Sequence, residues 1–503
     1  MIYKNAHELI DLIKKKELSS VELLEALLKR VEKVNPDLNA VVQLDVDRAL
    51  EKAKQADKDV AEGKELGPLH GLPMTIKDAY SVEGVVSTGG NPLWKEHVPE
   101  KNAEAVQHLV DAGAIVFGKT NVPLNSADIQ SYNDIYGVTN NPWDHDRTPG
   151  GSSGGSAASL ASGMSPLELG SDIGGSIRTP AHFCGLFGHK PSYNIISEVG
   201  HLPPPPGHIS TGNGLSVGGP LARSPEDIEI AMDVLAKPQG QDSLAWSIKL
   251  PEARTEKIEE IRIAVWPEEE YAEVDSEISS LIRQTASDLK SAGATVEEVP
   301  PPFTFKESDD VYSKLLNPLM LAGAPEETLQ QLDQLAKEVE DDDMSSLAKT
   351  ARGASIMYRD WVVVNAKRQY MRQQWKEFFT KYDVILAPVC VVPAFKHSHG
   401  PYQDRYLTIN GKDCEYWNST LWAGPAVMAN LPSTSTPIGL TESGLPVGLQ
   451  VTGPFLEDKT CIAVSKMIRD VRGGFRIPQG YEIDKISVEN GYHSERVSQT
   501  AIS

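Results

Sequence analysis

Apolar positions near the N-terminus recur at helical spacing. The stripe consists of Leu23, Leu24, Leu27, Leu28 and Val31. Ser19 and Glu22 occupy capping-box positions, which predicts a helix start, and Pro36 predicts its end. Ser224 and Asp227 repeat the capping-box spacing before a second apolar stripe. Further helices are expected over residues 46–62, 103–112, 156–164, 224–236 and 276–291.

Short apolar runs between these helices predict buried strands. They cover residues 114–118, 261–267, 294–299 and 382–389. Strands that alternate with helices are typical of an α/β layer fold, and the chain shows neither a fixed-period repeat nor an obvious linker. We therefore expect an α/β fold built on one large β-sheet, with residues 1–503 forming a single domain.

Two segments depart from this pattern. Residues 201–208, HLPPPPGH, are proline-rich and predict a stiff surface excursion. Residues 325–348 carry eight acidic residues and one lysine. This charge predicts a solvent-exposed helix with its turn, and the segment is a candidate for a mobile cover.

Composition narrows the classes of partner. The net charge is −22, from 70 acidic and 48 basic residues. Such a surface repels polyanions, so we expect no nucleic acid and no membrane as partners. The absence of a signal pattern and of a spanning apolar run predicts a cytoplasmic protein. The cysteines show no metal-like spacing and are expected to be packed or idle thiols without a metal; they are Cys184, Cys390, Cys414 and Cys461.

Two motif matches are rejected. Residues 113–120 fit the phosphate-binding loop pattern, but the apolar strand lies between the glycines, so Lys119 is expected to be structural. Residues 151–155 fit the G-x-S-x-G elbow of α/β-hydrolases, but polar, turn-forming residues precede them where a strand is required. A Ser-His-Asp enzyme is therefore the less favoured alternative.

Three motifs carry chemistry together. They are PGGSSGGS (149–156), LGSDIGGSIRTP (169–180) and TIKD (75–78). Alone, each has an ordinary interpretation: a flexible loop, a tight turn or a surface lysine. In combination, with Ser176 at a spacing of 24 residues from Ser152, they resemble the amidase signature family of serine amidases. The resemblance extends from HGLPMTIKDAY to GLPVGLQVTGP and is weak over residues 240–350.

The residues themselves suggest how such a site would work. A serine hydroxyl attacks an amide carbonyl only if a base removes its proton, and a lysine serves when burial keeps it neutral. Gly174 and Gly175 lack a Cβ, so the backbone N–H groups around them can approach a developing oxyanion. Asp172 and Arg178 are expected to form a buried ion pair that holds this loop. The scheme needs no cofactor and no metal.

The resemblance assigns these roles. It implies Ser176 as nucleophile, Ser152 as proton relay after a cis peptide bond, and Lys77 as base. The implied oxyanion donors are the amides of Ile173, Gly174, Gly175 and Ser176. The implied lining of the acyl pocket is Asn125, Ser126, Ala127 and Asp128. The fold it implies is a single large domain with a central mixed β-sheet covered by helices on both faces. Its catalytic core would comprise about residues 65–240 and 380–460, and its variable substrate loops about residues 240–350.

Three functions remain open, of which two are enzymatic and one is non-catalytic binding. The first is a free-standing amidase for small neutral amides, extending to anilides, esters or carbamates, with a homodimer as the assembly expected if the chain self-associates. The alternative is the glutaminase-type amidase subunit of a tRNA-dependent amidotransferase. Residues 357–384 resemble free-standing bacterial amidases, and the charge of −22 disfavours docking near tRNA. The third, a non-catalytic binding relative, is disfavoured because all three catalytic positions are filled.

Overall fold

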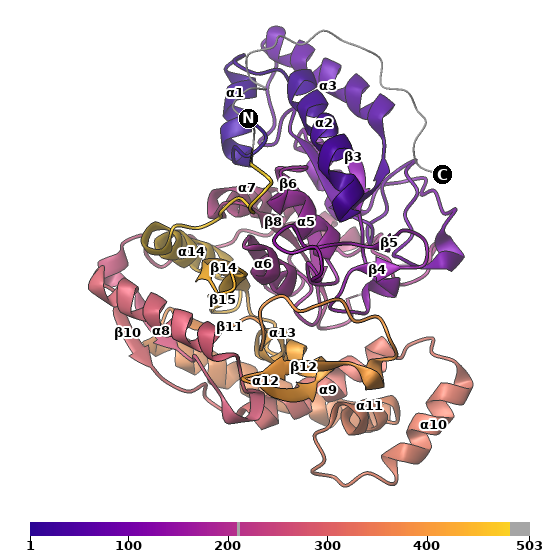
Figure 1. Cartoon of the computed structure of the whole chain (residues 1–503), viewed down its shortest axis with the longest axis vertical. Coiled ribbons are helices and arrows are strands. Elements are labelled where there is room, and N and C mark those ends of the chain that lie inside the picture. The colour runs from indigo at the N-terminus through magenta and orange to yellow at the C-terminus, as the bar shows by residue number, and fades with distance from the viewer. Residues whose placement is uncertain (209–211, 483–503) are drawn as a thin grey trace.

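A computed structural model describes residues 1–208 and 212–482. Eleven strands form one sheet (Figure 1). In spatial order they are β1 (Val41–Leu44), β3 (Ile115–Thr120), β2 (Pro73–Lys77), β6 (Leu167–Asp172), β8 (Val217–Ala222), β7 (Phe187–Lys190), β14 (Ser433–Leu440), β15 (Pro446–Thr452), β11 (Val384–Pro388), β9 (Arg262–Val265) and β10 (Thr295–Glu298). Two small hairpins lie outside it, β4 (Tyr132–Asn133) with β5 (Gly137–Val138) and β12 (Tyr406–Ile409) with β13 (Lys412–Glu415).

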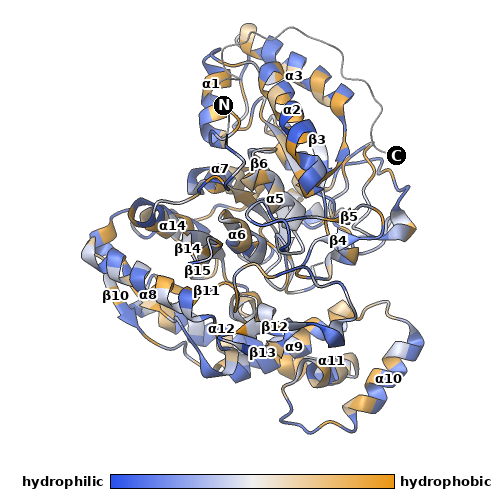
Figure 2. Ribbon diagram, viewed as in Figure 1, coloured by the Kyte–Doolittle hydropathy of each residue, from blue (hydrophilic) through white to orange (hydrophobic). Residues whose placement is uncertain are grey.

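The sheet is mixed, as expected. Strand β2 runs parallel to β3 and β6, whereas β6 is antiparallel to β8 and β14 is antiparallel to β15. The helices are α1 (Ala6–Lys14), α2 (Ser20–Leu38), α3 (Val46–Ala61), α4 (Glu104–Asp111), α5 (Gly154–Ala161), α6 (Arg178–Cys184), α7 (Pro225–Leu235), α8 (Ser276–Ser291), α9 (Phe305–Met320), α10 (Glu326–Ala336), α11 (Ser346–Ala354), α12 (Tyr358–Lys381), α13 (Gly424–Met428) and α14 (Asp458–Arg472). In Figure 2 the outer helices α2, α3 and α8 carry both hydrophilic and hydrophobic residues, as amphipathic helices do.

Strand β15 shows how one strand serves two faces. Its residues Val447, Leu449 and Val451 belong to the apolar cluster that includes buried residues of α8 and α14. The alternate residues Gly448 and Gln450 bond instead to side chains of α6. Because successive side chains of a strand point to opposite faces, helices cover both faces of the sheet here.

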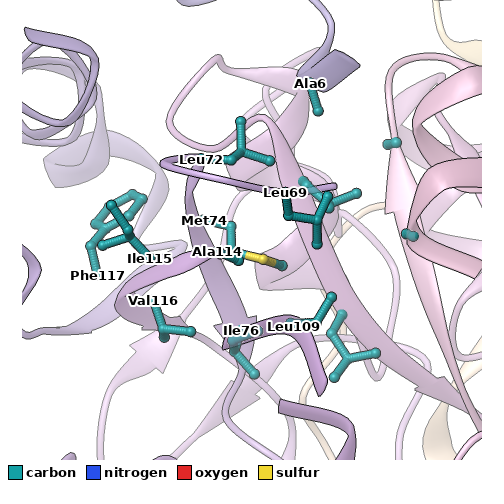
Figure 3. Packing of buried hydrophobic residues seen from close by; sticks show 14 of the residues in the cluster. Ala6, Leu69, Leu72, Met74, Ile76, Leu109, Ala114, Ile115, Val116 and Phe117 are labelled. Carbon is teal, nitrogen blue, oxygen red and sulfur yellow. The ribbon is translucent and has the colours of Figure 1, made fainter. Parts of the chain in front are cut away.

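The same alternation aims the candidate base. In β2, Met74 and Ile76 pack into the apolar cluster around β2 and β3 (Figure 3). Thr75 and Lys77 point the other way, and Lys77 is the last residue of the strand. The hydrophobic half of β2 therefore anchors the strand, and its polar half faces the site described below.

One helix boundary needs correction. The predicted N-terminal helix begins with the Ser19–Glu22 capping box, but it continues through Pro36 to Leu38. A proline this close to the end removes one hydrogen bond without breaking the last turn, because the Asn39 N–H still reaches the Asn35 carbonyl.

At the second capping site, the Ser224 hydroxyl accepts the Asp227 N–H as predicted. The Asp227 carboxylate does not reciprocate, because it accepts the N–H groups of Ala6 and His7 instead. Here a long-range contact takes the place of a local one.

The two unusual segments behave differently. Helix α10 contains no buried residue and lies at the periphery beside α11 (Figure 1), as predicted for the acidic segment. The prediction of a surface excursion for residues 201–208 is wrong at its start. Leu202 is buried and His201 contacts Tyr80 and Ser171, because the chain pairs with Tyr80 before it reaches the surface.

The remaining sequence predictions concern thiols and membranes. All four cysteines are unpaired and only Cys414 is not fully buried, as expected for packed thiols. Within residues 1–208 and 212–482, no helix is both long and apolar enough to cross a membrane.

Candidate active site

Lys77 ends β2 inside the protein, between two serine hydroxyls. Its Nζ lies 2.6 Å from Ser152 Oγ and 2.9 Å from Ser171 Oγ. The side chain is fully buried. Burial lowers the pKa of Lys77 to about 7, against the opposing negative charge of Asp172. A substantial fraction of this amine is therefore neutral near pH 7 and can act as a base.

Ser152 is held by close packing of its loop. The Gly151–Ser152 peptide bond is cis, as the resemblance predicted. A Cβ added at Gly151 would lie 2.5 Å from the Asp128 carbonyl oxygen and 2.6 Å from the Gln130 nitrogen. Only glycine fits there without displacing backbone, so the predicted pocket segment lies directly against the loop that carries Ser152.

Ser176 lies in the turn between β6 and α6. It is 7% exposed, and its hydroxyl makes no hydrogen bond to any residue that the structure describes. The Ser176 carbonyl accepts the Ser153 N–H at 3.2 Å, which joins the two serine-bearing loops. The hydroxyl is thus uncommitted, and its loop is bonded to the Ser152 loop.

The turn before Ser176 presents backbone amides. The Gly175 N–H donates to Asp172 Oδ1 at 2.9 Å. Over the described ranges, the amides of Ile173, Gly174 and Ser176 have no hydrogen-bond partner. Gly175 has φ +101°, and a Cβ there would lie 2.7 Å from Thr179 Oγ1. Of the four amides predicted to face an oxyanion, three are uncommitted and Gly175 is engaged.

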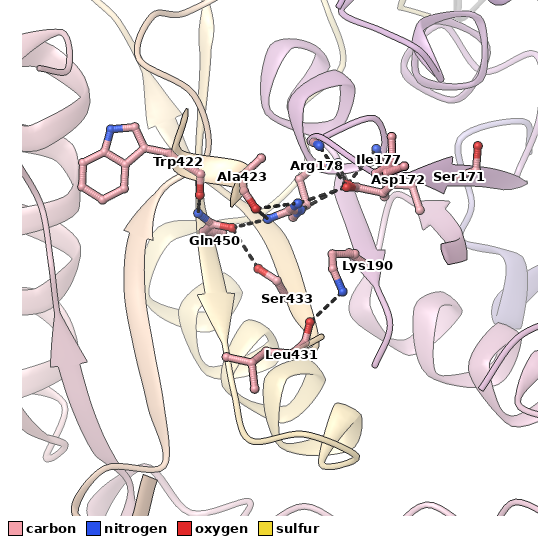
Figure 4. Close-up of polar contacts among 12 residues, drawn as sticks. Ser171, Asp172, Ile177, Arg178, Lys190, Trp422, Ala423, Leu431, Ser433 and Gln450 are labelled. Atoms are coloured by element: carbon pink, nitrogen blue, oxygen red, sulfur yellow. Dashed lines mark hydrogen bonds and ion pairs between the residues drawn. The ribbon is translucent and has the colours of Figure 1, made fainter. Parts of the chain in front are cut away.

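Asp172 and Arg178 form the predicted buried ion pair (Figure 4). Arg178 Nη2 lies 3.0 Å from Asp172 Oδ1, and its Nη1 donates to Gln450 Oε1 at 2.7 Å. Burial raises the pKa of Asp172, but Arg178 outweighs it and the net result is a pKa of about 2. The carboxylate stays ionised and also accepts the Gly175 and Ile177 amides, and the bond from Arg178 to Gln450 ties the turn to β15.

The last residue of the predicted pocket segment, Asp128, belongs to a second buried ion pair. Asp128 Oδ2 accepts from Arg405 Nη1 at 2.7 Å, and its Oδ1 accepts from the Tyr416 hydroxyl at 2.5 Å. Asn125 Oδ1 accepts from Asn91, and Ser126 Oγ is buried without a partner in the described chain. Ala127 offers its carbonyl to the Tyr402 hydroxyl at 3.4 Å. Aromatic side chains thus line the segment beside the Ser152 loop.

Both rejected motifs stay rejected. Gly118 lies within β3, where a phosphate loop would have to curl. Lys119 is buried and donates to Asp78 Oδ1 at 2.9 Å, so it is structural as predicted. Between β5 and Ser152 no strand of the described residues precedes the G-x-S-x-G sequence.

Sequence reasoning missed three residues of this region. Ser171 and His201 continue the hydrogen bonding behind Lys77, and the Tyr312 hydroxyl donates to the Ile173 carbonyl at 2.7 Å. Ser171 lies within the LGSDIGGSIRTP motif, but strand alternation would place it on the face of Leu169 and so did not indicate its contact with Lys77. His201 and Tyr312 lie in segments that carry no motif, so no local signal identified them.

Known proteins resemble this chain in sequence and in fold. The sequence model of the family described as Amidase matches residues 22–462. The chain is 31% identical to a glutamyl-tRNA(Gln) amidotransferase subunit from Natranaerobius thermophilus, covering 92% of this chain and 94% of the relative. It is 32% identical to the corresponding protein from a Sulfurihydrogenibium species, covering 92% and 96%. It also resembles the crystal structure of a bacterial aryl acylamidase of the amidase signature family, with TM-score 0.78, 26% identity and coverage of 96% and 99%.

Proposed function

Because the chain belongs to the amidase family, we propose that it hydrolyses the C–N bond of an amide through an acyl-enzyme on Ser176. The observation that carries this proposal is the buried contact of 2.6 Å between Lys77 Nζ and Ser152 Oγ. It joins a lysine of lowered pKa to a serine loop that in turn bonds the Ser176 backbone.

The proposed cycle needs no oxidant or reductant, because each bond change is accompanied only by proton transfers. Neutral Lys77 takes the Ser152 proton while Ser152 takes the Ser176 proton, and Ser176 Oγ bonds to the substrate carbonyl carbon. The uncommitted amides before Ser176 stabilise the negative oxygen. When the C–N bond breaks, Ser152 protonates the departing amine and recovers a proton from Lys77. Water, deprotonated by the same relay, then bonds to the acyl carbon; the bond from that carbon to Ser176 Oγ breaks, Ser176 recovers its proton through Ser152, and the acid is released.

The first candidate substrate is a small neutral amide or anilide. The Arg178 and Arg405 guanidinium groups near the serine loops already bond to Asp172 and Asp128. A carboxylate substrate would need a basic group of its own, since breaking a buried pair is costly. The similarity to an aryl acylamidase supports the same substrate class.

The second candidate is a glutaminase-type subunit of an amidotransferase. The names of the curated relatives support this role more strongly than they support a free-standing amidase. The same Ser176 chemistry would then release ammonia from glutamine, and partner subunits would use it.

A single panel separates the two. The purified chain, as monomer or homodimer, is assayed on aliphatic amides, anilides, esters, carbamates and glutamine. Turnover of a neutral amide by the lone chain supports the first candidate. Turnover of glutamine and of no other substrate in the panel supports the second. Ser176→Ala should abolish either, whereas the buried control Ser162→Ala, whose hydroxyl bonds only carbonyls of α5, should not. Residual activity of Ser176→Ala within about tenfold of wild type would exclude the acyl-enzyme.

A further inference from the structure

His201 is connected to the candidate base, Lys77, by hydrogen bonds through one serine, Ser171. Its Nε2 lies 2.9 Å from Ser171 Oγ, and the same Oγ lies 2.9 Å from Lys77 Nζ. On the other side of the ring, Nδ1 lies 3.1 Å from the Pro203 carbonyl oxygen. The contacts form one chain from a backbone carbonyl to the lysine.

The chemistry of these groups sets the direction of each hydrogen bond. A carbonyl oxygen only accepts, so Nδ1 carries the imidazole proton and Nε2 is an acceptor. The Ser171 hydroxyl therefore donates to Nε2, and its oxygen accepts an N–H from Lys77. Burial, with the nearby charge of Lys77, lowers the pKa of His201 to about 4, which keeps the ring neutral.

The ring is clamped by the segments that carry its partners. Tyr80, three residues after Lys77, packs edge-on against His201, with the ring centroids 4.9 Å apart. The backbones of the two residues also form an antiparallel β-bridge. The Tyr80 hydroxyl donates to the Gly170 carbonyl at 3.0 Å, next to Ser171. The Tyr80 ring and the Ser171 hydroxyl thus hold the imidazole in place, and Lys77 is one hydroxyl away.

We propose that His201 is a positioning residue which, through Ser171, directs the lone pair of Lys77 toward Ser152. A neutral lysine has two N–H bonds and one lone pair. Because Ser171 gives its proton to His201, it can accept from Lys77 but cannot donate to it, and Ser152 remains the partner for the lone pair. Without an acceptor at Nε2, Ser171 can turn its proton onto Lys77 and compete with Ser152. This inference rests on the proposed function.

The test measures the rate at which phenylmethylsulfonyl fluoride sulfonylates Ser176 at pH 8, followed by intact mass, so no substrate is needed. His201→Gln places an amide oxygen near the former Nε2, whereas His201→Asn and His201→Leu do not. We expect His201→Asn and His201→Leu to react about a hundredfold more slowly and His201→Gln to retain most of the rate. His208→Leu, an exposed histidine of the same segment, is the matched control and should react like wild type.

A double variant separates positioning from general damage. Ser171→Ala removes only a hydroxyl, and adding His201→Leu to it should slow the reaction no further, because the two residues act through one hydrogen bond. Additive losses, or a wild-type rate in folded His201→Leu, would overturn the proposal. If His201→Leu does not fold, the proposal is overturned when His201→Gln and His201→Asn react at the same rate. Failure of the wild-type chain to be labelled at Ser176 would instead refute the proposed function.

Discussion

Tyr312→Phe tests whether the variable region controls the chemistry. The Tyr312 hydroxyl, from α9, donates to the Ile173 carbonyl at 2.7 Å, and the side chain is buried. That carbonyl shares one peptide plane with the Gly174 N–H, a proposed oxyanion donor. Because a peptide unit is rigid, a fixed oxygen also fixes the direction of the N–H. Loss of one hydroxyl on a distant helix should therefore weaken stabilisation of the oxyanion.

The magnitude follows from what the substitution removes. It leaves one carbonyl short of a partner, which costs about 1–3 kcal/mol of unfolding free energy. It leaves the Gly174 N–H in place but less well aimed. Complete loss of an oxyanion donor costs roughly 100- to 1000-fold in kcat. We expect a smaller loss of about tenfold, or about 1.4 kcal/mol, with little change in KM.

The assay compares kcat and KM on a neutral aryl amide with urea unfolding of the same samples. Tyr271→Phe is the matched control, because its hydroxyl donates to Asp309 Oδ2 at 2.7 Å, on the same helix but away from Ile173. A kcat for Tyr312→Phe within twofold of wild type, or an equal loss in Tyr271→Phe, would refute the reasoning.

Four further predictions follow from the same contacts. The pKa of Lys77, about 7, makes kcat/KM fall about tenfold per pH unit below pH 7 and level off above it, because only the neutral amine accepts a proton; a flat profile from pH 5 to 9 would contradict this. Arg178→Met leaves Asp172 buried without its partner and should lower the unfolding free energy by about 3–5 kcal/mol, measured in urea. Gly151→Ala forces a Cβ against backbone and should cost about 1–3 kcal/mol by the same measurement. A neutral aryl amide should have a higher kcat/KM than its carboxylate analogue at both low and high salt; preference for the anion at both would show an unrecognised basic pocket.

Local patterns predicted part of the fold. Helix α2 follows from its leucine stripe and capping box, and β3 from one apolar run. The predicted strands β9 and β10 appear around the predicted helix α8. The buried pair of Asp172 and Arg178 was predictable as well, because both residues flank one turn. Such features depend on neighbours within a few residues, so the chain itself specifies them.

By itself the sequence determined which residues are proposed to carry the chemistry: three motifs, with their glycines and serines, point to Lys77, Ser152 and Ser176. Only the tertiary structure decided what surrounds them. Ser171 lies 94 residues from Lys77, and Tyr312 lies 139 residues from Ile173. His201 follows no motif, and the pairing of its backbone with Tyr80 brings it to the site. Contacts of this kind depend on how sheet and loops pack, because a hydroxyl or imidazole has no sequence signal for the distant group that it will meet.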